Sequence, residues 1–85
     1  MLIDVEILAE LGEFTRASAD HPRRRIVVFR RADGNFTFAE QYHYTSIEEG
    51  VMIASGWATL PAEGVYSSLE LAASDGQAAL KARCA

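Results

Sequence analysis

The chain has 85 residues, of which 49% are hydrophobic and 24% charged, and its formal net charge at pH 7 is −4. This composition is that of an ordinary soluble globular protein, away from the disordered and transmembrane extremes. The length supports a single domain, residues 1–85, because two cores would leave each half near the limit of roughly 40 residues below which chains need external support to fold.

So small a domain is commonly reinforced by disulfides, a metal or a second subunit. Cys84 is the single cysteine, and the two histidines, His21 and His43, are separated by 22 positions with no cysteine near either. This spacing predicts no structural metal site and no cofactor. Homodimerisation is the remaining way to reinforce the domain.

The two ends of the chain differ in charge. The N-terminal sequence is acidic where a signal peptide would be basic, and no apolar run approaches the roughly 18 residues of a spanning helix. We therefore expect a cytoplasmic protein that does not enter a membrane. Residues 1–31 carry a net charge of +1 and residues 32–85 a net charge of −5, so the basic groups cluster near one predicted strand.

The first segment, Asp4–Ala17, predicts a helix. Its apolar residues recur at spacings of four, four and three, with the glutamates off that stripe, which is the period of an amphipathic helix. The apolar positions are Ile3, Ile7, Leu11 and Phe14. Asp4 is a suitable N-cap. A short strand over Leu2–Ile7, where apolar and acidic residues alternate, is the alternative.

A β-hairpin is predicted next, from Arg25–Arg31, the turn sequence Ala32–Gly34 and Asn35–Tyr44. A two-residue loop would pair Phe29 with Phe38. A three-residue loop with Gly34 in the left-handed conformation would instead pair Val28 with Phe38.

We favour the three-residue loop because it gathers the large apolar side chains on one face of the hairpin. That face would carry Ile26, Val28, Phe36, Phe38 and Tyr42, and the opposite face Arg25, Arg31, Thr37, Ala39, Gln41 and His43.

A third strand over Val51–Leu60 follows a turn at Glu48–Gly50, and Pro61–Gly64 is typical of a further turn. Ser67–Glu70 then has the form of a helix capping box. The alanine-rich helix that begins there is weakened or broken by Ser74–Gln77.

The expected fold is α+β, with the order helix, three antiparallel strands, helix, and both helices on one face of the sheet. The other face would be open, and its expected cover is a second copy or another protein. The same order of elements occurs in double-stranded RNA-binding domains. The resemblance is one of topology, since Ser67–Asp75 at the start of the last helix contains two acids and no base, whereas that family has a basic cluster there.

No catalytic constellation is visible, so a non-enzymatic protein is expected. His43 has Gln41 and Thr45 as its strand neighbours, and these supply neither an orienting carboxylate nor a nucleophile. The candidate interaction surface combines aromatic and arginine side chains, the residues enriched at binding hot spots. Its members are Arg25, Arg31, Gln41, Tyr42, His43, Tyr44 and Trp57.

Three functions follow from these residues. The leading one is a protein-interaction module that acts as a homodimer. The first alternative is a small-ligand or metal-binding pocket formed by Tyr42, His43, Tyr44 and Trp57. The second is weak nucleic-acid binding through Arg23–Arg31, since lysine and arginine supply most of the affinity for phosphates.

Overall fold

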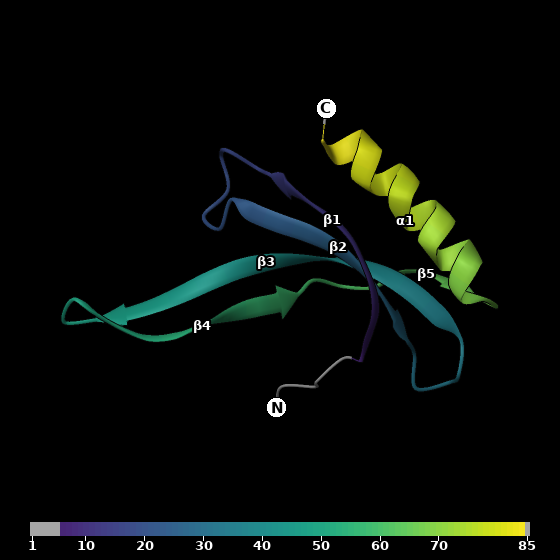
Figure 1. Ribbon diagram of the computed structural model, residues 1–85, viewed down its shortest axis with the longest axis horizontal. Coiled ribbons are helices and arrows are strands. Elements are labelled where there is room, and N and C mark those ends of the chain that lie inside the picture. The colour runs from purple at the N-terminus through teal and green to yellow at the C-terminus, as the bar shows by residue number, and fades with distance from the viewer. Residues whose placement is uncertain (1–5, 85) are drawn as a thin grey trace.

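The computed structural model describes residues 6–84, which form an antiparallel sheet of five strands with a single C-terminal helix (Figure 1). The elements are β1 (Ile7–Thr15), β2 (Arg23–Arg30), β3 (Phe36–Glu48), β4 (Val51–Thr59), β5 (Glu63–Tyr66) and α1 (Leu69–Arg83). Strands β1 to β4 lie side by side in the sheet in the order in which they follow in the sequence, and β5 pairs with the beginning of β3. The predicted order of helix, three strands and helix is therefore wrong.

The predicted N-terminal helix is replaced by a strand. Residues 7–15 form β1, while Asp4, the expected N-cap, and most of the alternative strand Leu2–Ile7 lie outside the described residues. Two register shifts interrupt the pairing of β1 with β2, between Ile7 and Ala9 and between Glu10 and Gly12. Each inserted residue changes which face the next side chain occupies. The two core-packed residues Leu11 and Phe14 are consequently three positions apart, a spacing that resembles a helical period.

The hairpin prediction is confirmed, including its register. Val28 pairs with Phe38 and Arg30 with Phe36. Gly34 has a φ of 86°, and its amide donates to the Arg31 carbonyl at 3.0 Å. A residue with a side chain would be strained in this left-handed conformation, so glycine is suited to closing the three-residue loop.

The C-terminal helix is confirmed, but its start and continuity differ from the prediction. The N-cap is Ser68 rather than Ser67, and the Ser68 hydroxyl accepts a hydrogen bond from the Leu71 amide at 3.2 Å. The segment Ser74–Gln77 does not break α1. The expected turn Pro61–Gly64 runs into β5, because Glu63 already pairs with Phe38.

The continuity of α1 is explained by how closely it approaches the sheet. A Cβ atom at Gly76 would lie 2.6 Å from Leu11 Cδ1 and 3.3 Å from Phe38 Cβ. Glycine lowers intrinsic helix propensity, but at Gly76 its small size lets the helix axis lie near β1 and β3. The core between α1 and the sheet contains Phe14, Ile26, Val28, Phe38 and Ala72.

The face of the sheet opposite α1 is not open at its centre, contrary to expectation. Val27, Phe29 and Ala39 form a second buried cluster there, and Val27 and Ala39 have no exposed surface. Thr37 is buried on the same face and donates a hydrogen bond to the Gly64 carbonyl at 2.8 Å. Exposed apolar surface must therefore be sought elsewhere on the sheet.

Gly76→Val should destabilise the fold by about 1–3 kcal/mol, because the added side chain overfills the contact between α1 and the sheet. The matched control is Ala78→Val on an exposed position of the same helix, where the loss of helix propensity is only about 0.6 kcal/mol. Thermal unfolding of the two variants checks this prediction, with each kcal/mol lowering Tm by roughly 4–8 °C in a domain of this size. Equal melting temperatures would contradict the close packing at Gly76.

Candidate functional site

Four of the predicted surface residues come together on the face opposite α1. Arg25 pairs with Gln41, and His43 with Trp57, in the register of β2, β3 and β4. The Arg25 Nε donates to Gln41 Oε1 at 2.7 Å, and the Gln41 amide donates to the Thr59 hydroxyl at 2.9 Å. A polar ladder thus crosses three strands at the end of the second buried cluster.

Trp57 is the centre of this group. The guanidinium carbons of Arg25 and Arg23 lie 4.3 Å and 5.1 Å from the centroid of its ring, and His43 approaches its edge at 5.1 Å between centroids. Each such cation–π contact is worth about 0.5–1 kcal/mol at an exposed site. Glu10 and Glu13 pair with Arg25 and Arg23, so the arginines have carboxylate partners as well as an aromatic one.

The two tyrosines of the predicted surface have the opposite parity to His43 and therefore face the side on which α1 lies. The Tyr42 ring packs against His21 at 4.7 Å between centroids, and the Arg24 guanidinium lies 5.5 Å from its centroid. Tyr44 lies over Gly56, where its hydroxyl would be 3.1 Å from an added Cβ. The four residues proposed to form one ligand pocket are therefore divided between the two faces of the sheet, with Tyr42 and Tyr44 on one and His43 and Trp57 on the other.

Arg31 is also apart from the group, because it lies in the turn after β2 and pairs with Asp33 at 3.1 Å. Carboxylates likewise pair with Arg23, Arg24 and Arg25. A phosphate that bound to the arginine strand would have to compete with these carboxylates.

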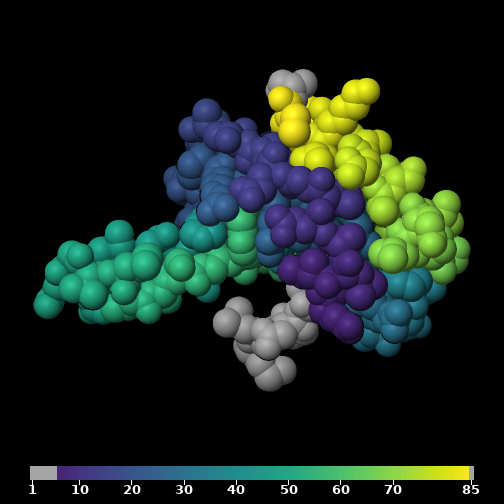
Figure 2. Space-filling model, viewed as in Figure 1, coloured from purple at the N-terminus to yellow at the C-terminus, as the bar shows by residue number. Residues whose placement is uncertain are grey.

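Among the described residues, several exposed large apolar side chains gather on a projecting hairpin that was not among the residues predicted from the sequence. β3 continues to Glu48, whereas its pairing with β2 ends at Tyr42. We refer to residues 43–56, the two-stranded part beyond this point, as the arm. It projects from the body in Figure 2, where it is coloured teal to green. Among the described elements, the backbone of β4 approaches that of β3 alone.

Four large apolar side chains are exposed near the tip of the arm. They are Ile47, Val51, Met52 and Ile53, each 58–65% exposed. The turn between them is a tight two-residue loop, Glu49–Gly50, and both loop residues have positive φ, at 52° and 79°. These angles match a type I′ turn, whose twist keeps the two strands paired.

Within residues 6–84 no strand pairs with the outer edge of β4, and this free edge has little protection against strand pairing. Edge strands are usually guarded by lysines, prolines, inward charges or bulges. The nine residues of β4 include no charge and no proline, and one bulge at Ile53 interrupts its pairing with β3. The opposite edge of the sheet, β1, contains two register shifts together with Glu10 and Glu13. The two edges are therefore unequally protected.

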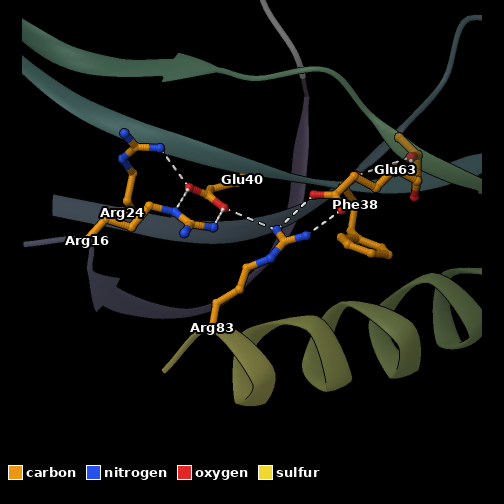
Figure 3. A network of polar contacts seen from close by, with 7 residues as sticks. Arg16, Arg24, Phe38, Glu40, Glu63 and Arg83 are labelled. Carbon is orange, nitrogen blue, oxygen red and sulfur yellow. Dashed lines mark hydrogen bonds and ion pairs between the residues drawn. The ribbon is translucent and has the colours of Figure 1, made fainter. Parts of the chain in front are cut away.

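A second group of residues, centred on Glu40, is buried and was not anticipated. Glu40 is only 3% exposed, and its Oε2 accepts hydrogen bonds from Arg16 Nε at 2.8 Å and Arg24 Nη1 at 2.7 Å. Its Oε1 accepts from Arg16 Nη2 at 3.0 Å and Arg83 Nη1 at 3.2 Å. Arg83 also pairs with Glu63 at 2.9 Å (Figure 3). We call these five residues the Glu40 cluster.

The Glu40 cluster holds the end of α1 against the sheet, because Arg83 is in the last turn of the helix while Glu40 and Glu63 are on β3 and β5. The pKa of the Glu40 carboxyl is lowered, mainly by the hydrogen bonds from Arg16. Burial acts in the opposite direction and raises this pKa. The Glu63 carboxylate raises the pKa of Arg83. Among the described residues, no buried side-chain polar atom is left without a partner.

The sequence contains only a weak signal for the arm and for the Glu40 cluster. The partners of Glu40 are 16, 24 and 43 positions away along the chain, so no local spacing marks them. The arm could have been anticipated from apolar residues on both sides of Glu48–Gly50, which predict strands that continue up to the turn.

Within residues 6–84, no group of three or more histidine, cysteine or carboxylate side chains is arranged to hold a metal ion. The described helix is also unsuited to crossing a membrane. Comparison with protein-family models, curated proteins and solved structures yields no match to this chain.

Glu40→Gln should lower the free energy of unfolding at pH 7 by about 3 kcal/mol, since it leaves three guanidiniums around a neutral side chain. Urea unfolding checks this value. Glu13→Gln, which removes the carboxylate from an exposed pair with Arg23, is the control and should change stability little.

The effect of Glu40→Gln should also depend on pH. Because folding lowers the pKa of Glu40 from its ordinary value of 4.5, its ionised form stabilises the fold fully above pH 4.5. That contribution is lost as the pH falls through the lowered pKa of the folded state. The difference between variant and parent should therefore shrink below pH 4.5, and a difference that is constant down to pH 2 would contradict the assignment.

Proposed function

We propose that the protein is a non-enzymatic protein-interaction module that acts as a homodimer and that the arm is its contact surface. The observation that carries this proposal is the exposure of four large apolar side chains on a hairpin that no other described element supports. Exposed apolar surface beyond scattered single residues marks interaction sites in small proteins.

The arm is costly to maintain if it serves no contact. A two-stranded hairpin without further packing is marginally stable in water. Burying an exposed valine, isoleucine or methionine side chain stabilises a complex by about 1.5–3 kcal/mol, and the arm presents four such residues, of which Ile47 and Met52 lie opposite each other across its strands. A partner on the arm would thus stabilise the element that recognises it.

A second copy is the partner that the arm favours. The stretch from Val51 to Thr59 contains no charged residue, so that two copies can meet along it without placing like charges opposite one another. The proposal includes a cytoplasmic location, which the single cysteine supports, because a chain with one cysteine forms no internal disulfide.

Ile53→Glu should weaken self-association at least tenfold, because it places a charge within the apolar contact. Light scattering coupled to size-exclusion chromatography, over a dilution series from about 100 μM, measures the shift from dimer to monomer. Leu71→Glu is the control, because Leu71 is 53% exposed but lies on α1, away from the arm. A parent protein that is strictly monomeric throughout this range would refute the homodimer.

A further inference from the structure

We propose that two copies join by pairing their β4 strands antiparallel to each other, so that the two sheets continue into one. This inference rests on the proposed function and specifies its geometry. Strand addition at a free edge supplies backbone hydrogen bonds in addition to side-chain contacts. A two-fold axis that passes beside Gly56 would relate the two copies.

The direction of the backbone groups on β4 follows from one hydrogen bond. The Leu60 amide donates to the Glu40 carbonyl at 2.9 Å, and the register is unbroken from Gln41 opposite Thr59 to Ser46 opposite Ala54. Hydrogen-bonded and non-hydrogen-bonded pairs alternate in an antiparallel ladder. Residues 54, 56 and 58 therefore bond to β3, while Ser55, Trp57 and Thr59 direct their amides and carbonyls to the free edge.

The bulge at Ile53 limits where the two-fold axis can lie. The regular part of β4 runs from residue 54 to residue 59, and its middle falls between Gly56 and Trp57. An axis at Trp57 would bring together the Arg23 and Arg25 side chains that lie over this ring in both copies, and like charges at close range are unfavourable. An axis at Gly56 moves the two Trp57 rings two positions apart along the strands and so weakens this repulsion.

Gly56 also suits the axis on steric grounds. At this axis, Gly56 faces its own copy in a non-hydrogen-bonded pair, where the Cα atoms approach to about 4.5 Å. Ser55 of each copy then faces Trp57 of the other, and their outward amides and carbonyls complete the ladder. A glycine at the closest crossing leaves room for the Tyr44 side chain that lies over it.

In this arrangement the acidic tip of the arm approaches a cluster whose net charge is +1. Antiparallel pairing carries the acidic tip, Glu48 and Glu49, past the partner's Leu60 toward the Glu40 cluster. Three guanidiniums face two carboxylates in that cluster. The arm's other free edge, residues 43–48 of β3, is shorter and includes Glu48, and for this reason β4 is the better pairing strand.

The assembly closes at two copies. A two-fold contact uses the same strand of both subunits, so pairing through β4 occupies both β4 edges. Each sheet then keeps β1 as an edge, which is protected by two register shifts and two glutamates, and the six-residue edge of β3 over residues 43–48, which includes Glu48.

Disulfide trapping tests the position of the axis. In a Cys84→Ser background, Gly56→Cys should form an intermolecular disulfide on mild oxidation, because Cα atoms about 4.5 Å apart are within the range of disulfide geometry. Ala58→Cys is the matched control on the same strand. With the axis at Gly56, its two copies would be four positions out of step, about 13 Å apart, and should not be linked.

Ser55→Pro tests the pairing without a cysteine. It removes an amide that points to the free edge, and proline is tolerated on edge strands in that position. The variant should fold, with a helix and sheet signal like that of the parent, but should dimerise at least tenfold more weakly in light scattering. This second variant decides the question if Gly56→Cys fails to fold.

The outcomes separate the two proposals. A dimer that is trapped at Gly56 but not at Ala58, and that is weakened by Ser55→Pro, supports β4 pairing. If the parent is a dimer but folded Gly56→Cys is not trapped, or Ser55→Pro leaves the dimer unchanged, pairing about Gly56 is overturned while the homodimer stands. A monomeric parent overturns both.

Discussion

The length of β3 is the constraint on which the rest of the structure depends. At 13 residues it is the longest strand, and it pairs with β2 on one side and with both β5 and β4 on the other. Its first half is buried beneath α1, and its second half continues into the arm, where only β4 pairs with it. One strand therefore connects the core of the domain to the surface proposed to bind a partner.

Glu40 lies where these two halves of β3 meet. Its carboxylate binds guanidiniums from Arg16, which directly follows β1, from β2 and from the last turn of α1, so one side chain joins three parts of the chain at the base of the arm. Removing an ionised carboxylate from water is unfavourable, and four charge-assisted hydrogen bonds offset this penalty. Through Arg83 the cluster adds directional charge-assisted hydrogen bonds to the apolar contacts that hold α1 on the sheet.

Local signals in the sequence were sufficient for some elements and misleading for others. The register of the β2–β3 hairpin and the existence of α1 were predictable, because a glycine turn and a capping serine act within a few residues. β1 was not, because its bulges shift the apolar residues to a helical spacing, and sequence periodicity assumes an uninterrupted element. The Glu40 cluster could not be predicted, since it depends on the tertiary approach of residues that are far apart in the sequence.

The same reasoning accounts for the shift in the candidate surface. The sequence predicted a binding surface on an open face of the sheet, but Val27 and Ala39 are fully buried there. Next to them, Arg25 and Gln41 use their polar groups in hydrogen bonds within the sheet. In a chain of 85 residues, the apolar residues on the arm are lost to the core. A monomer therefore buries less apolar surface than its composition allows, and a domain of this size is already of marginal stability. In the proposed dimer part of this loss is recovered on association, and the stability of the fold then rises with protein concentration.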